Sequence, residues 1–151
     1  MRLFIDCEWN GYGGELISMA LVPLNSARHH LYFEVDLPEG IKIDPWVEEN
    51  VLTKLDGPVH SYEECQAQLS KYLLGCQGPV EIIADWPEDI ERLCRMLITG
   101  AGTKVAAPRK LIMTIMDFDE MDTISRVPHH ALHDARAIRG AYVERFFNDD
   151  R

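Results

Sequence analysis

The sequence is short of basic residues: 15 lysines and arginines stand against 25 aspartates and glutamates, so the 151-residue chain has a net charge of −10. A protein that coats DNA or RNA without sequence preference needs a basic surface, because it must neutralise phosphates. The charge therefore argues against non-specific coating of nucleic acid. It allows weak, local and metal-dependent contact with a polyanion, since bound cations can neutralise a group of carboxylates.

The sequence also has no apolar run long enough to cross a membrane and no secretory leader, so a cytoplasmic protein is expected. Its four cysteines form neither a Cys-x-x-Cys pair nor the spacing of zinc ligands. They fall within apolar segments, which favours buried free thiols. No repeat, low-complexity tract or linker divides the chain, so we expect one domain over residues 1–151.

The pattern of apolar residues predicts a sheet covered by helices. Strands are expected at 3–8, 16–22, 31–36, 80–84 and 111–115, and helices at 45–52, 61–74, 87–98 and 131–147. Short turn-prone segments join the first three strands, which suits antiparallel neighbours. The last two strands alternate with helices and should run parallel to the first. The expected fold class is α/β, with a mixed five-stranded sheet flanked by helices.

Two acidic residues, Asp6 and Glu8, follow the first apolar segment. Side chains on a strand alternate between its faces, so both carboxylates should project from one face while Cys7 points to the other. Hard oxygen ligands suit Mg²⁺ and Mn²⁺, and such a pair can form part of a metal site. A strand that simply ends in a solvated acidic pair has the same pattern, so the interpretation depends on partners elsewhere.

A second acidic group, Asp85 and Asp89, joins the end of the strand expected at 80–84 to the start of the next helix. Asp85 is placed to cap that helix, and Asp89 lies in its first turn, where negative charge is favourable. Taken alone, both residues would be interpreted as charges that stabilise a helix N-terminus.

The third group opens the last helix, in the sequence His129-His-Ala-Leu-His-Asp134. A histidine that follows proline stands here five residues before an aspartate. A solvated histidine-rich loop is one interpretation. A transition-metal site formed by His129, His130 and His133 is another, because imidazole nitrogen is a common ligand of Zn²⁺ and Ni²⁺.

In their order along the chain, the three groups resemble the motifs of the DEDDh 3′→5′ exonucleases, the family of ribonuclease T, oligoribonuclease and the proofreading exonucleases. Asp6-x-Glu8 is similar to the first motif, Asp89 at a helix start to the second, and His129-x-x-x-x-Asp134 to the third. The compact bacterial exoribonucleases that favour adenylate-rich RNA are the most similar members, from chain length and the opening strands.

The middle motif departs from the family pattern, in which an asparagine precedes the catalytic aspartate. The chain reads Asp85-Trp-Pro-Glu-Asp89 over this stretch. Alignment of the strand ends places Asp85 at the asparagine position and Asp89 at the catalytic one. Asp89 is therefore the expected ligand, with Asp85 as the alternative.

The resemblance implies a ribonuclease H-like fold and a metal-dependent exonuclease that releases nucleoside 5′-monophosphates from single-stranded 3′ ends. Asp6, Glu8, Asp89 and Asp134 would hold two Mg²⁺ or Mn²⁺ ions, and His129 would be the general base. Four carboxylates in one site would repel one another, which is a separate reason to expect cations there. RNA is favoured over DNA as the substrate, although no residue decides between them. A homodimer is expected, as for related exonucleases.

Three residues next to the acidic pair, Trp9, Asn10 and Tyr12, could contact the terminal nucleotide by stacking or hydrogen bonding. Packing in the core or in a loop is the alternative for Trp9. Arg136 and Arg139 follow the third group on the last helix, where they either meet phosphate or belong to a solvated helix face.

Two other functions fit the sequence. A non-catalytic member of the same fold that binds nucleic acid or protein would be consistent with the net charge of −10. Such a module has little need for four converging carboxylates. A hydrolase of another class, with His129, His130 and His133 as its ligands, would depend on a tightly held transition metal.

Overall fold

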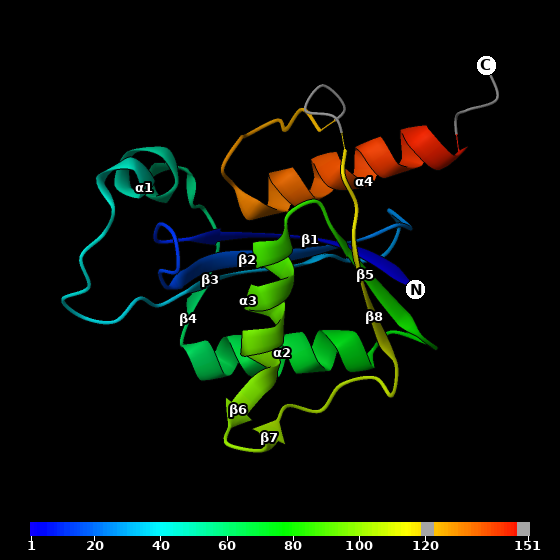
Figure 1. The fold of residues 1–151 in the computed structure, drawn as a ribbon, viewed down its shortest axis with the longest axis horizontal. Coiled ribbons are helices and arrows are strands. Elements are labelled where there is room, and N and C mark those ends of the chain that lie inside the picture. Colours follow the sequence, from blue (N-terminus) through cyan, green and yellow to red (C-terminus); the bar gives the residue numbers. More distant parts are fainter. Residues whose placement is uncertain (119–122, 148–151) are drawn as a thin grey trace.

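A computed structural model of the chain describes residues 1–118 and 123–147. Its main feature is one mixed sheet in the order β4-β3-β2-β1-β5-β8 (Figure 1). These strands are β1 (Arg2–Trp9), β2 (Leu16–Pro23), β3 (Leu31–Val35), β4 (Val59–His60), β5 (Val80–Ala84) and β8 (Leu111–Ile115). The other elements are α1 (Pro45–Asn50), the 3₁₀-helix η1 (Leu52–Lys54), α2 (Tyr62–Leu74), α3 (Pro87–Leu97), the small hairpin β6 (Ile98–Gly100) and β7 (Thr103–Lys104), and α4 (Ala131–Phe147).

The strand directions confirm the α/β prediction. β1 pairs antiparallel with β2 and β2 with β3, while β5 pairs parallel with β1 and β8 with β5. The predicted number of five strands is wrong for this sheet, because β4 adds a sixth at the edge beside β3. A two-residue strand is too short to show the alternation by which strands are recognised in a sequence.

Helices pack on both faces of the sheet, and its inner strands β2 and β5 are mostly buried and apolar (Figure 1). On one face, Leu3 and Ile5 of β1 pack in the main core with residues of α2 and α3 such as Leu69 and Leu93. On the other face, Phe4 packs with residues of α4. Alternate residues of β1 therefore face α4, and this decides where its acidic residues point.

A side-chain cap is present at the start of α2 and absent at the start of α3. α2 opens with a capping box, in which Ser61 Oγ accepts from Glu64 N at 3.2 Å and Glu64 Oε2 accepts from Ser61 N at 2.9 Å. α3 ends at Leu97, one residue before the end expected at 98, because Ile98 begins β6. Asp85 does not cap α3, whose N-cap is Trp86 without a side-chain hydrogen bond. The cap prediction failed because α3 begins at Pro87 as expected, so the N-cap position falls on Trp86 and Asp85 lies one residue before it.

Within the described residues, no helix combines the length and the apolar character needed to cross a membrane.

Candidate active site

The packing of α4 against β1 brings acidic residues of both elements together. Phe4 and Ile138 belong to one hydrophobic cluster between the sheet and α4. Asp6 and Glu8 follow Phe4 on the same face of β1, because side chains alternate along a strand. Asp134 precedes Ile138 by about one helical turn of α4. The three carboxylates therefore meet at the end of the sheet where β1 leaves the core.

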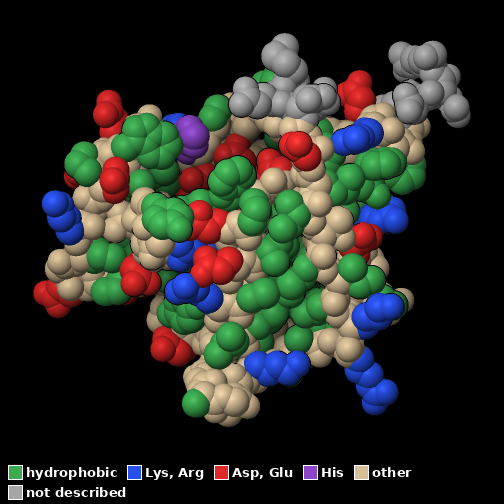
Figure 2. Space-filling view, in the orientation of Figure 1, with side chains coloured by type: hydrophobic (Ala, Val, Ile, Leu, Met, Phe, Trp, Pro, Cys, Tyr) green, Lys and Arg blue, Asp and Glu red, His purple; other side chains and the backbone are tan. Residues whose placement is uncertain are grey.

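These carboxylates line a cleft of about 680 Å³. It lies beside α1, between the ends of β1 and β5 and the start of α4. Figure 2 shows acidic side chains gathered in this hollow, with hydrophobic side chains on either side. The lining residues include all five predicted catalytic residues, Asp6, Glu8, Asp89, His129 and Asp134, together with Asp85.

Asp6 is the member that two groups of carboxylates share. One group is Asp6, Asp85 and Asp89, and the other is Asp6, Glu8 and Asp134. In each group, carboxylate oxygens of the three residues lie within 4.8 Å of one another. Carboxylate oxygens at such separations can bind one hard divalent cation. The arrangement therefore has room for two cations with one ligand in common.

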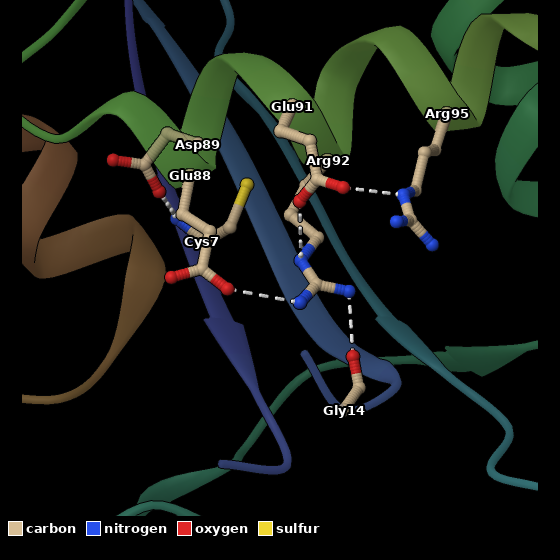
Figure 3. Close-up of polar contacts among 7 residues, drawn as sticks. All are labelled: Cys7, Gly14, Glu88, Asp89, Glu91, Arg92 and Arg95. Carbon is tan, nitrogen blue, oxygen red and sulfur yellow. Dashed lines mark hydrogen bonds and ion pairs between the residues drawn. The ribbon is translucent and has the colours of Figure 1, made fainter. Parts of the chain in front are cut away.

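The middle motif places both of its aspartates at the cleft. Asp89 is 1% exposed, and its Oδ1 accepts a hydrogen bond of 2.9 Å from the backbone N–H of Cys7 (Figure 3). Asp85 is only partly buried and lines the same cleft. Both residues can therefore contribute to the group that contains Asp6, and neither alternative from the sequence is eliminated.

Asp134 supports the backbone of the histidine that precedes it. Its Oδ2 accepts from His129 N at 2.9 Å and from His130 N at 3.3 Å. His129 has a backbone φ of +63°, a left-handed conformation that residues other than glycine seldom adopt. Its side chain is exposed and lines the cleft, so the imidazole stands at the mouth of the carboxylate groups.

Two buried carboxylate oxygens in the cleft lack a protein partner. They are Asp6 Oδ2 and Asp134 Oδ1, and no hydrogen-bond donor of the described residues reaches either of them. Buried polar atoms are nearly always satisfied, and an unpartnered oxygen in an acidic cluster is typical of a cation site. The chemistry of these residues therefore fits a hard divalent metal.

The electrostatics of the cleft favour a cation for the same reason. Burial raises the pKa of Asp6 well above its ordinary value, and the neighbouring carboxylates, Asp89 foremost, raise it further. Burial also raises the pKa of Asp89, against the lowering effect of the Cys7 hydrogen bond. Burial and the charge of Asp134 raise the pKa of Glu8 to about 8. A divalent cation would reverse these shifts by favouring the charged forms.

We expect the free energy of unfolding of the metal-free protein to fall as the pH rises from about 5 to about 8. A carboxyl group with a higher pKa in the folded chain than in the unfolded chain costs no stability below the unfolded pKa. The cost grows above that value, near pH 4 for glutamate, and levels off above the folded pKa. For Glu8 the folded pKa is about 8. The urea midpoint in EDTA should therefore fall between about pH 5 and pH 8.

The control for this prediction is Glu8→Gln, which removes the titrating carboxyl group and should make the pH dependence shallower. Saturating Mn²⁺ should raise the midpoint at high pH, since a ligand that binds only the folded state stabilises it. A midpoint in EDTA that is level or rises across this pH range would contradict the assignment of raised carboxyl pKa values.

A buried arginine fixes α3 against the turn between β1 and β2 (Figure 3). Arg92 donates from Nη1 to Gly14 O at 2.5 Å and from Nη2 to Glu88 Oε1 at 3.1 Å. Its guanidinium carbon also lies 5.6 Å from the centre of the Trp9 ring. Since Asp89 is on the same helix, these contacts help to hold its carboxylate at the end of β1.

The predicted substrate-contact residues have different positions. Trp9 and Tyr12 line the cleft, and Tyr12 is almost fully exposed. Alternation along β1 puts Trp9 on the face of Leu3 and Ile5, so its ring packs against the main core beside the guanidinium of Arg92, as the packing alternative expected. Asn10 does not line the cleft: its side chain donates to Lys42 O and accepts from Asp44 N, at 2.9 and 2.8 Å.

The sequence interpretation missed two tryptophans at the cleft. Trp46 is the second residue of α1 and Trp86 precedes α3, and their side chains are 52% and 59% exposed. Both line the cleft. Pro45 signals the start of α1, but only tertiary contacts place that helix beside the carboxylates.

The histidine site considered from the sequence is not formed. The groups of possible metal ligands among the described residues consist of aspartates and glutamate, and His129, His130 and His133 belong to none of them. The ring of His130 is buried and its Nε2 lies 3.1 Å from Asp56 Oδ1. The arginines of α4 are also away from the cleft: Arg139 donates to Leu24 O at 3.0 Å, and Arg136 lies on the opposite side of α4.

Comparison of the sequence with protein-family models and with curated proteins found no match.

Proposed function

We propose that the chain is a metal-dependent 3′→5′ exonuclease of the DEDDh type with a ribonuclease H-like fold. The observation that carries the proposal is the pair of carboxylate groups that share Asp6, with His129 at the mouth of the same cleft. The order of the three groups along the chain agrees with the motifs of that family, and the middle group departs from the pattern in having Asp85 where the family has an asparagine. A structural acidic patch would not require buried carboxylate oxygens without donors.

The residues that would hold Mg²⁺ or Mn²⁺ are Asp6, Glu8, Asp134 and one or both of Asp85 and Asp89. When bound, the cations would acidify the attacking water and stabilise negative charge on the leaving oxygen.

The imidazole of His129 would act as the general base and accept the proton of the attacking water. The oxygen of that water forms a bond to the terminal phosphorus as the bond from phosphorus to the 3′ oxygen breaks. The leaving 3′ oxygen takes a proton from solvent. The products are a nucleoside 5′-monophosphate and a strand that is one residue shorter and ends in a 3′ hydroxyl.

The rim of the cleft supports an unpaired strand as the substrate. Tyr12, Trp46 and Trp86 present exposed rings around the carboxylates. Aromatic rings bind unstacked bases at about 1–3 kcal/mol per base, largely without regard to sequence. We propose single-stranded RNA as the favoured substrate and DNA as the alternative. We also propose a homodimer, in which a second copy would supply basic residues that this acidic chain has in short supply.

A time course with 5′-labelled single-stranded RNA and DNA of one sequence, in Mg²⁺, Mn²⁺ or EDTA, tests the proposal. We expect a ladder that shortens from the 3′ end and disappears in EDTA, because the carboxylates act only with cations. A circular RNA of the same sequence is the control, since it has no 3′ end and should stay intact. Intact strands in both metals would refute the nuclease and favour the non-catalytic binding module.

A further inference from the structure

The segment that follows β3 forms an arm beside the cleft, which we define as residues 44–56 and call the α1–η1 arm. Val47 and Val51 of the arm pack with Ile17 of β2 in a small hydrophobic cluster separate from the main core. The arm thereby has its own attachment to the sheet. Trp46 near its start, and Lys54 and Asp56 at its end, contact residues of the loop that carries His129.

Two hydrogen bonds from the end of the arm fasten the residues on either side of His129. Lys54 Nζ donates to Pro128 O at 2.7 Å. Asp56 Oδ1 lies 3.1 Å from His130 Nε2. His129 is thus held through both of its neighbours by residues of one short segment.

The start of the arm contacts His129 itself. The indole of Trp46 meets the imidazole edge-on, with ring centres 4.9 Å apart and an interplanar angle of 79°. Because His129 has a φ of +63°, its backbone is in a conformation that needs support from its surroundings. Asp134 supports this backbone through its bond to His129 N, and Trp46 of the arm contacts the side chain.

The contact between His130 and Asp56 joins a buried, packed ring to an exposed carboxylate that the fold does not need. The His130 ring is 2% exposed and stacks on Tyr32 with centres 5.0 Å apart. The Asp56 side chain is 77% exposed, so it is not needed to fill the core. A buried imidazole held by an exposed carboxylate can be tested without removing any packed side chain.

We propose that Asp56 and Lys54 are positioning residues that hold His129 at the cleft through Pro128 and His130. This inference rests on the proposed function, in which His129 is the general base. A base that shifts by about 1 Å can lose on the order of 10²-fold in rate, because proton transfer requires close alignment. Neither positioning residue belongs to the two carboxylate groups.

Asp56→Ala is the decisive variant, because Lys54 also affects Glu8 through its charge. We expect kcat to fall about 10- to 100-fold, with KM and Mn²⁺ affinity unchanged. Asp56→Asn should restore most of the rate, since its amide oxygen can still accept from His130 Nε2. Asp36→Ala, at an exposed aspartate outside the arm, is the matched control and should behave as wild type.

A second measurement does not depend on activity. The ring-current shift that Trp46 imposes on the His129 carbon-bound protons, located in NMR spectra with His129→Ala, should be lost in Asp56→Ala and kept in Asp56→Asn. The proposal requires both the fall in kcat and the loss of this shift, and either one without the other overturns it. If wild-type protein cleaves nothing, the proposed function fails. If wild-type protein cleaves and Asp56→Ala matches it in rate and spectrum, only this inference fails.

Discussion

Replacement of Asp6 by asparagine should reduce metal-dependent cleavage by roughly 10³-fold or more, because cations contribute several kcal/mol to such reactions and each 1.4 kcal/mol is about tenfold. Asp6 is the one residue common to both carboxylate groups, so a neutral amide weakens both at once. The measurement is kcat/KM on single-stranded RNA in saturating Mg²⁺. Wild-type activity in Asp6→Asn would exclude the cleft as the catalytic site.

Calorimetry with Mn²⁺ shows whether Asp6→Asn loses activity through lost cation binding or through misfolding. It also compares the contributions of the single carboxylates in each group. Asp6→Asn should weaken all Mn²⁺ binding, while its metal-free form should be at least as stable as wild type. The metal-free variant should keep this stability because the substitution removes a carboxylate whose pKa is raised by burial. Asp85→Asn and Asp89→Asn, compared in the same experiment, identify which aspartate of the middle motif is the stronger ligand.

The positions of the carboxylates could be predicted because each depends on local structure. Alternation along one strand puts Asp6 and Glu8 on a common face, and the end of β5 puts Asp85 and Asp89 at the same edge. The start of α4 adds Asp134. These relations follow from strand and helix periodicity, which the apolar residues of the sequence display. The parallel and antiparallel directions of the strands follow from the same pattern of apolar residues.

The aromatic rim and the arm could not be predicted, because they depend on contacts between distant segments. Trp46 is 83 residues from His129 in the sequence, and no periodic pattern relates them. Asn10 is polar and adjacent to the acidic pair, yet its amide is used to hold the backbone before α1. Tertiary packing decides both, and local propensity carries no information about it.

His129→Ala is expected to lower kcat by roughly 10²- to 10⁴-fold, the range that a general base contributes. Its Mn²⁺ affinity should be unchanged, because the imidazole belongs to neither carboxylate group. His30→Ala, at an exposed histidine that does not line the cleft, is the control and should keep wild-type kcat. The two measurements are kcat on single-stranded RNA and calorimetric titration with Mn²⁺.

The combination of results from Asp6→Asn and His129→Ala distinguishes a base from a ligand. A ligand loses cation affinity and rate together, whereas a base loses rate alone. If His129→Ala weakened Mn²⁺ binding as strongly as Asp6→Asn, the imidazole would have to be reassigned to the metal site. If it left kcat unchanged, the proton of the attacking water would have to leave by another path, and the contacts that hold His129 would have no part in catalysis.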